Sequence, residues 1–204
     1  MESMYHSCMV KTFAKVVLFT EQTREHEVKI YICTHFFLFT FKNETNCLQV
    51  QRLLAVIRGL SKSVPSQKLI VGNVASGWVP VRNPKSKYFI TEDQYAEASY
   101  PAFVTGPSYL VSKLAVKILY YSALEHPFLH LEDVFLTGII AEKEDIPRRH
   151  AVEFRNNPVR IPAKFLGCTL LRTISIHKVL PKEQKELAEM ATNPQCGKGL
   201  HKLH

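Results

Sequence analysis

Apolar residues in the first quarter of the chain form two runs separated by a polar segment. The runs cover residues 13–19 and 30–41, and EQTREHE lies between them. Short apolar runs bounded by polar turn residues are typical of buried strands. We therefore expect a pair of strands or a hairpin within residues 1–47, a divergent N-terminal segment that lacks the patterns found later in the chain.

From residue 48 onward, helical and strand-like patterns alternate. Leucine and isoleucine recur at helical spacing over residues 48–60, and Gly59 followed by Ser61 predicts the end of this helix. Apolar runs at residues 68–74 and 86–91 predict two strands. This alternation favours an α/β domain over an all-α or all-β fold.

The middle of the chain continues the alternation. The turn signal Gly106-Pro107 predicts a break before a short strand at residues 108–111. Ser112 suits the N-cap of a helix over residues 113–125, and a second helix is predicted from Glu132 or Asp133 to about residue 143. The buried face of the first helix is expected to consist of Leu114, Val116, Ile118, Leu119 and Tyr121.

The residue pattern in the last part of the chain predicts one strand, one helix and a flexible tail. Residues 172–179 alternate in the manner of a strand, and Pro181 suits the first turn of a final helix. Residues 193–204 are rich in basic residues and are expected to form a flexible tail. We therefore divide the chain into residues 1–47, a domain at residues 48–192, and the tail.

Composition narrows the possible functions. Hydrophobic residues make up 46% of the 204-residue chain and charged residues 22%, as in ordinary globular proteins. The net charge of +8 would suit a polyanion, but the basic residues are scattered and form no helical stripe or RNP-like motif. We therefore expect no nucleic-acid partner, and an acidic sugar nucleotide fits the charge equally well. No apolar stretch reaches the roughly 20 residues that a membrane span requires.

The acidic pair Glu132-Asp133 has two interpretations. Acidic residues at a helix N-terminus interact favourably with the helix dipole, for about 0.3–1 kcal/mol each, and local grounds favour this interpretation. Alternatively, a partly desolvated carboxylate at the edge of a cleft could accept a proton from a substrate hydroxyl. The apolar, histidine-containing run before the pair supports this second possibility.

The segment YPAFVTGPSYLVS, residues 100–112, also has two interpretations. Gly106 either forms an ordinary turn between strands or allows the backbone to pass close to a ligand. Tyr100 and Tyr109 either stack on sugar rings or belong to the core.

Taken in order, these motifs resemble the family 31 glycosyltransferases, which are β1,3-galactosyltransferases and β1,3-N-acetylglucosaminyltransferases. The likeness extends from about residue 48 to about residue 181. Several motifs at family-like spacing are far more specific than any single one. The positions that carry the resemblance are Arg82, Lys87-Tyr88-Phe89, Tyr100-Pro101, the segment GPSYLVS at residues 106–112, and Glu132-Asp133-Val134.

The resemblance implies a GT-A-like fold, in which helices flank a Rossmann-like mixed sheet. It implies an enzyme on the lumenal side of the Golgi membrane, attached by a type II signal anchor that is not evident here. The expected reaction moves galactose or N-acetylglucosamine from a UDP-sugar to a glycan hydroxyl on a glycoprotein or glycolipid, with inversion. Asp133 is the implied base and Glu132 the second choice. The implied substrate-binding residues are Arg82, Lys87, Tyr88, Tyr100, Gly106, Ser108 and Tyr109.

The chain departs from the family in two respects: residues 1–47 show no match to the family's nucleotide-binding half, and the metal-binding motif is missing. Family members hold a manganese ion through an Asp-x-Asp motif, because the leaving diphosphate needs a hard cation. The only aspartates here are Asp93, Asp133 and Asp145, and no two of them form that motif. We therefore predict no metal-ligating residues, and we expect the chain to represent the C-terminal part of a catalytic domain, incomplete on its N-terminal side. A non-catalytic lumenal glycan-binding or partner protein is the alternative.

Overall fold

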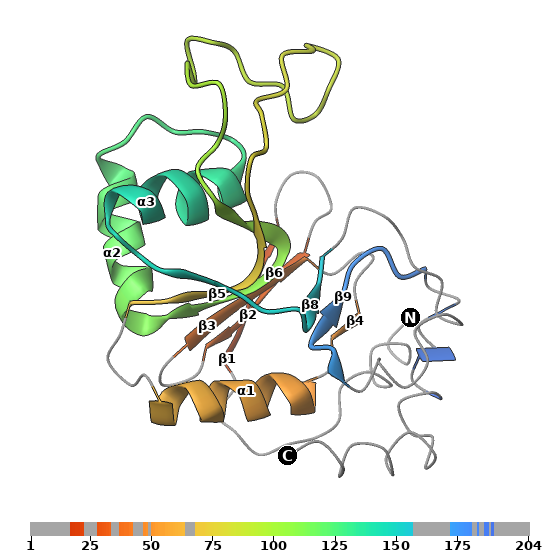
Figure 1. Ribbon diagram of the computed structural model, residues 1–204. Coiled ribbons are helices and arrows are strands. Elements are labelled where there is room, and N and C mark those ends of the chain that lie inside the picture. The colour runs from red at the N-terminus through yellow and green to blue at the C-terminus, as the bar shows by residue number, and fades with distance from the viewer. Residues whose placement is uncertain are drawn as a thin grey trace.

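The chain folds around a central sheet that separates two helical layers (Figure 1). Helix α1 covers one face of the sheet, and α2 and α3 lie on the other. The computed structural model describes residues 17–22, 28–33, 37–42, 47–48, 50–63, 68–156 and 172–180, together with residues 183, 186, 187 and 189.

The central sheet contains six strands in the order β1-β2-β3-β6-β5-β7. Only β5 and β7 pair in parallel, and every other neighbouring pair is antiparallel. This mixed sheet with helices on both faces confirms the expected α/β, GT-A-like architecture. The six strands are β1 (Val17–Gln22), β2 (Val28–Cys33), β3 (Phe37–Lys42), β5 (Ile70–Ala75), β6 (Phe103–Ser112) and β7 (Arg148–His150).

The strands of the N-terminal segment belong to this same sheet. The expected hairpin is present as β1 and β2, whose residues pair antiparallel from Val17–Cys33 to Gln22–Val28. The apolar run 30–41, expected to be one strand, instead contributes to both β2 and β3. These two strands pair antiparallel, so the chain must reverse direction between them. Strand β3 in turn pairs with β6, from Phe37–Ser112 to Phe41–Ser108.

A second, smaller sheet connects distant parts of the sequence. Its order is β4-β9-β8, from strands β4 (Cys47–Leu48), β9 (Ser175–Ile176) and β8 (Phe154–Arg155). The strand predicted over residues 172–179 is therefore only two residues long. The rest of that segment turns, with Lys178 at a φ of 61°. Residues 193–204 lie outside the described residues.

Helix α1 (Val50–Ser63) confirms the first predicted helix but continues through its predicted end. Its buried side chains Leu53, Ile57 and Leu60 pack against the sheet on both sides of Gly59. That packing continues to the last turn, so a single exposed glycine does not end the helix.

Helix α2 (Lys113–Leu124) begins at the predicted N-cap. The Ser112 hydroxyl accepts hydrogen bonds from the backbone N–H of Ala115 at 3.3 Å and of Leu69 at 3.0 Å. The predicted buried face is partly wrong, because Leu114 and Tyr121 are exposed. The stripe that faces the sheet consists of Ala115, Leu119 and Ser122.

Alternation along β5 and β6 divides the core between the two helical layers. Ile70 and Val111 belong to the cluster that also contains the buried residues of α2. Val71 and Leu110, their neighbours in sequence, belong to the cluster beneath α1. Successive side chains of a strand point to opposite faces, so both faces of these strands are buried.

The segment between β5 and β6 is a long loop that projects beyond the sheet (Figure 1). The strand predicted at residues 86–91 is wrong, since this segment consists of turns with one isolated bridge between Val81 and Phe89. The loop is held instead by Arg82, whose guanidinium donates to the carbonyls of Ile90 at 2.9 Å and Tyr95 at 2.7 Å. Among the described helices, none is both long and apolar enough to span a membrane.

Candidate functional site

An irregular stretch of β6 forms the centre of the candidate site. Gly72 lies opposite Tyr109 and Val74 lies opposite Val104, so two steps along β5 match five along β6. The extra residues of β6 surround Gly106-Pro107, where a turn was predicted. That prediction is wrong, because β6 continues as a strand. A bulge accommodates proline, which has no N–H to give to the ladder.

Asp133 lies directly against this bulge. Its Oδ2 accepts a hydrogen bond from the Gly106 N–H at 2.8 Å, and its Oδ1 accepts one from the Val134 N–H at 3.0 Å. A Cβ at Gly106 would lie 3.1 Å from Oδ2, so the absence of a side chain there permits the contact. The Asp133 side chain is only half-buried. The carboxylate is therefore held in place while part of it remains accessible from solvent.

The neighbouring carboxylate of Glu132 is occupied by a protein partner. Its Oε1 accepts a hydrogen bond from the hydroxyl of Tyr109, whose ring is buried in the core. Tyr109 therefore lies on the sheet side of the site, where it fixes Glu132. Glu132 thus has one hydrogen-bonded oxygen, whereas both oxygens of Asp133 accept backbone hydrogen bonds.

Asp133 begins the helical segment predicted from Glu132 or Asp133, and most of that segment is π-helical. The π-helix η1 (Asp133–Ile140) leads into α3 (Ala141–Lys143), which ends at the predicted residue.

Thr137 connects this helix to the strand, and the sequence analysis did not select it. Its buried hydroxyl accepts from the Val104 N–H at 2.8 Å and donates to the Asp133 carbonyl at 2.6 Å. A polar residue inside the apolar run VFLTGII was the signal for it. The backbone of Asp133 is thus tied to β6 beside the bulge.

The structure places Ser108 away from an open surface. Its hydroxyl donates to Asn156 Oδ1 at 3.1 Å and is bonded to the Ser175 hydroxyl, and all three residues are buried. Ser108 therefore contributes to a polar cluster that joins β6 to the small sheet. Asn156 and Ser175 were missed by the sequence analysis because they lie far from β6 in the chain.

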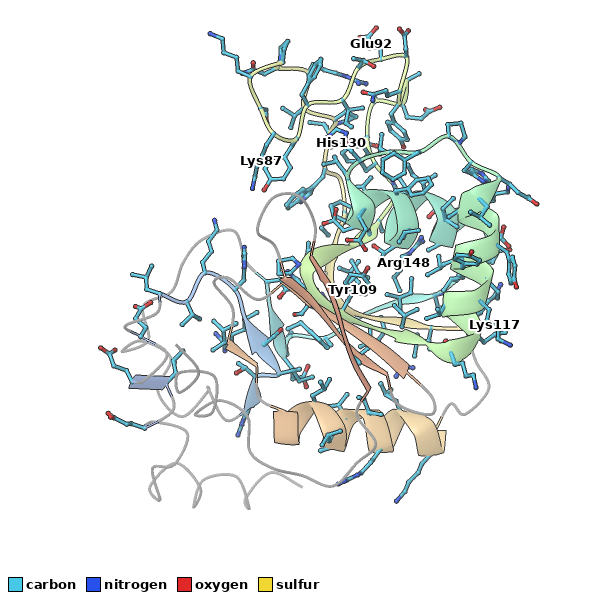
Figure 2. All side chains as sticks on the ribbon, turned by 180° about the vertical axis from the view of Figure 1, so that it is seen from behind. Lys87, Glu92, Tyr109, Lys117, His130 and Arg148 are labelled. Atoms are coloured by element: carbon cyan, nitrogen blue, oxygen red, sulfur yellow. The ribbon has the colours of Figure 1, made fainter. Side chains whose placement is uncertain are left out.

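Lys87 and Tyr88 lie together on the projecting loop and are exposed. The Lys87 ammonium is 4.9 Å from the centre of the Tyr88 ring. Figure 2 shows Lys87 on this loop and Tyr109 on the sheet, in different parts of the molecule. The structure therefore does not bring this pair to Tyr109.

Tyr100 connects the projecting loop to the core. Its side chain is 6% exposed, and its ring packs 5.1 Å from Tyr95 and 6.4 Å from Phe103, measured between ring centroids. No hydrogen-bond partner for its hydroxyl is found among the described residues. Burial raises the pKa of the Tyr100 phenol, the Arg82 guanidinium opposes this shift, and the charges of Tyr95 and Asp133 add to it.

We expect the free energy of unfolding of Tyr100→Phe to decrease less with pH, above pH 10, than that of the wild type. The pKa of the phenol is raised above the ordinary 10.0 in the folded state. Its contribution to the free energy of unfolding is therefore complete below pH 10.0 and is lost as the pH rises through the folded-state pKa. Without the hydroxyl, the free energy of unfolding should fall less steeply above pH 10. Urea unfolding across this range would measure the slope. Tyr120→Phe, at an exposed tyrosine, is the control, and equal slopes in Tyr100→Phe and wild type would contradict the expectation.

The described residues do not fit a manganese ion. Among them, no group of three or more His, Cys, Asp or Glu side chains is arranged to hold a metal. Both carboxylate oxygens of Asp133 already accept backbone hydrogen bonds. We therefore derive no catalytic step through a metal.

Known proteins resemble this chain over the segment that contains the site. The family model described as Galactosyltransferase matches residues 44–152. Human beta-1,3-galactosyltransferase 1 is 28% identical over 123 residues, which cover 60% of this chain and 36% of that protein. The human N-acetyllactosaminide beta-1,3-N-acetylglucosaminyltransferase 4 is 28% identical over 138 residues, covering 66% of this chain and 36% of the relative.

A third relative is somewhat more similar. The lactosylceramide 1,3-N-acetyl-beta-D-glucosaminyltransferase of Xenopus tropicalis is 35% identical over 136 residues, 65% of this chain and 35% of that protein. The matches thus span roughly a third of the length of these relatives. Residues 44–152 are 109 of 204 residues, more than half of the sequence. The chain belongs to the galactosyltransferase family.

Proposed function

We propose that this chain contributes the acceptor side of a hexosyltransferase that moves galactose or N-acetylglucosamine from a UDP-sugar to a glycan hydroxyl. The observation that carries the proposal is the Asp133 carboxylate, held at 2.8 Å by the Gly106 N–H and still partly exposed. The three relatives are named for transfer of these two sugars. Their names support the class of reaction and leave the donor open between the two.

In the proposed step, Asp133 acts as a general base. The acceptor oxygen forms a bond to C1 of the donor sugar while the bond from C1 to the phosphate oxygen breaks. The electron pair of that bond leaves with UDP, and the proton of the acceptor hydroxyl passes to the Asp133 carboxylate. Attack opposite the leaving group inverts C1. The Gly106 N–H holds the carboxylate in position before the reaction, so little reorganisation is needed.

We assign the remaining predicted residues to supporting roles. The buried Tyr100 ring supports the loop from the core, and exposed Tyr88 offers a flat apolar face for a sugar ring. Arg82 shapes the loop that carries Tyr88. We also propose Golgi residence and a manganese requirement, both on the resemblance to the family, although the aspartates of this chain form no Asp-x-Asp motif for the ion.

A transfer assay tests the proposal. Purified protein would be incubated with radiolabelled UDP-galactose or UDP-N-acetylglucosamine, Mn²⁺ and a panel of acceptor sugars. We expect labelled product with one donor, and its loss when EDTA removes the metal. Absence of product with every donor and acceptor would contradict the proposal and favour a non-catalytic glycan-binding protein. Isothermal titration would then show acceptor binding without metal-dependent UDP binding.

A further inference from the structure

A buried amide lies behind the segment that holds Asp133. Asn156 follows β8 and is 4% exposed. Its Nδ2 donates to the carbonyl of Ser108 at 2.8 Å and to the carbonyl of Thr105 at 3.4 Å. These two carbonyls flank Gly106-Pro107 on either side. Asn156 therefore binds the backbone on both sides of Gly106-Pro107, and the Gly106 N–H in turn donates to Asp133.

The bulge needs such a partner. Residues 105–108 of β6 fall between the last pairs that match β5, so the Thr105 carbonyl has no place in that ladder. A buried carbonyl without a partner costs about 1–3 kcal/mol. The Asn156 amide satisfies this requirement from the neighbouring sheet.

The orientation of the amide is itself fixed. Ser108 Oγ donates to Asn156 Oδ1 at 3.1 Å, and Ser108 Oγ is bonded to the Ser175 hydroxyl from β9. With Oδ1 accepting from a hydroxyl, Nδ2 must face the two backbone carbonyls. The small sheet thus sets the position of the bulge, and the bulge sets the position of the Gly106 N–H.

We propose that Asn156 is a positioning residue for the Asp133 carboxylate, acting through the backbone of residues 105–108. This inference rests on the proposed role of Asp133 as the base. Asn156 touches neither the substrate nor the base. Its effect passes through one hydrogen bond, from the Gly106 N–H to Asp133 Oδ2.

An NMR measurement tests the effect of Asn156 on the Gly106–Asp133 hydrogen bond without requiring turnover. The Gly106 amide proton should resonate downfield because it donates to a carboxylate. Its chemical shift in Asp133→Asn serves as the reference for a Gly106 N–H without a charged acceptor. In Asn156→Ala, we expect the Gly106 resonance to move most of the way to the Asp133→Asn position. Ser122→Ala is the matched control, because it removes a partly buried hydrogen bond, from Ser122 Oγ to Glu144 Oε1 at 2.8 Å, on a different helix from the Asp133 site. The Gly106 resonance should not move in this control.

Kinetics supply the second readout. We expect Asn156→Ala to lower kcat on the order of tenfold with little change in the acceptor KM, because misplacement of a catalytic group affects the chemical step. If Asn156→Ala does not fold, Asn156→Ser, with a smaller polar side chain, serves in both measurements. An unmoved Gly106 resonance, or a kcat equal to that of Ser122→Ala, would overturn the inference. A transfer rate unaffected by Asp133→Asn would instead overturn the proposed function, whatever the resonance does.

Discussion

Gly72→Ala should destabilise the protein and impair transfer, although it adds a single methyl group. A Cβ at Gly72 would lie 2.5 Å from Val104 Cγ1 and 3.0 Å from Tyr109 Cβ. Val104 is fully buried and β-branched, and its backbone is held by Thr137, so it has little freedom to move away. Overpacking of this kind typically costs about 1–3 kcal/mol.

The displacement of Val104 would also affect the candidate site around Asp133. Val104 lies two residues before Gly106, so a shift of β6 moves the N–H that holds Asp133. We therefore expect kcat to fall on the order of tenfold, since small errors in position are costly for catalysis. Thermal unfolding should show a decrease of about 2–4 °C in Tm for each kcal/mol lost.

Gly59→Ala is the matched control for this prediction. Gly59 is an exposed residue within α1, and a Cβ there would meet nothing within 4 Å. Alanine is favoured over glycine inside a helix by roughly 0.5–1 kcal/mol, so this variant should be slightly more stable than wild type with unchanged transfer. If the two variants shift Tm in the same direction, the close approach at Gly72 does not constrain β6.

Local patterns predicted the elements whose causes are local. Ser112 was identified as an N-cap because its hydroxyl acts on an N–H three residues away, within the reach of a sequence motif. The start of η1 at Asp133 and the end of α3 at Lys143 also follow from local signals. The order of strands and helices, and hence the α/β class, could be predicted in the same way.

The bulge in β6 could not be predicted from local sequence, because it depends on the pairing of β6 with strands that are distant in the sequence. Gly106-Pro107 is a turn signal, but β5 pairs with β6 on both sides of it, with Gly72 opposite Tyr109 and Val74 opposite Val104. Pairing with a strand that is distant in the sequence therefore overrides the local preference for a turn. Similarly, the apolar run at residues 86–91 forms turns because Arg82 binds the loop carbonyls, which no periodicity reveals.

The candidate site was partly visible in the sequence. The motifs identified Asp133 and Gly106, which the structure joins by a hydrogen bond, and Glu132 and Tyr109, which it joins by another. Asn156 was invisible because its partners are 48 and 51 positions away and its amide acts on backbone carbonyls, which every residue carries. Ser108 was assigned to the substrate, whereas its buried hydroxyl faces Asn156 and Ser175.

Asp133→Asn should have the largest effect on transfer of any variant considered. Asparagine keeps the shape of the side chain and one hydrogen-bond-accepting oxygen, but it cannot accept the proton of the acceptor hydroxyl. General base catalysis contributes roughly 10²–10⁴-fold to a rate, so kcat should fall by that factor with little change in the KM for the acceptor. The substitution leaves the buried core residues of η1 in place, and an unchanged circular dichroism spectrum would confirm that the variant folds.

The most direct measurement is the rate of sugar transfer by wild type, Asp133→Asn and Asp93→Asn under identical donor, acceptor and metal concentrations. Asp93 lies on the exposed loop and serves as a control for the same chemical change. The account predicts that Asp93→Asn transfers at the wild-type rate and that Asp133→Asn retains about 1% or less. Transfer by Asp133→Asn at a rate close to that of Asp93→Asn would contradict the assignment of Asp133 as the base.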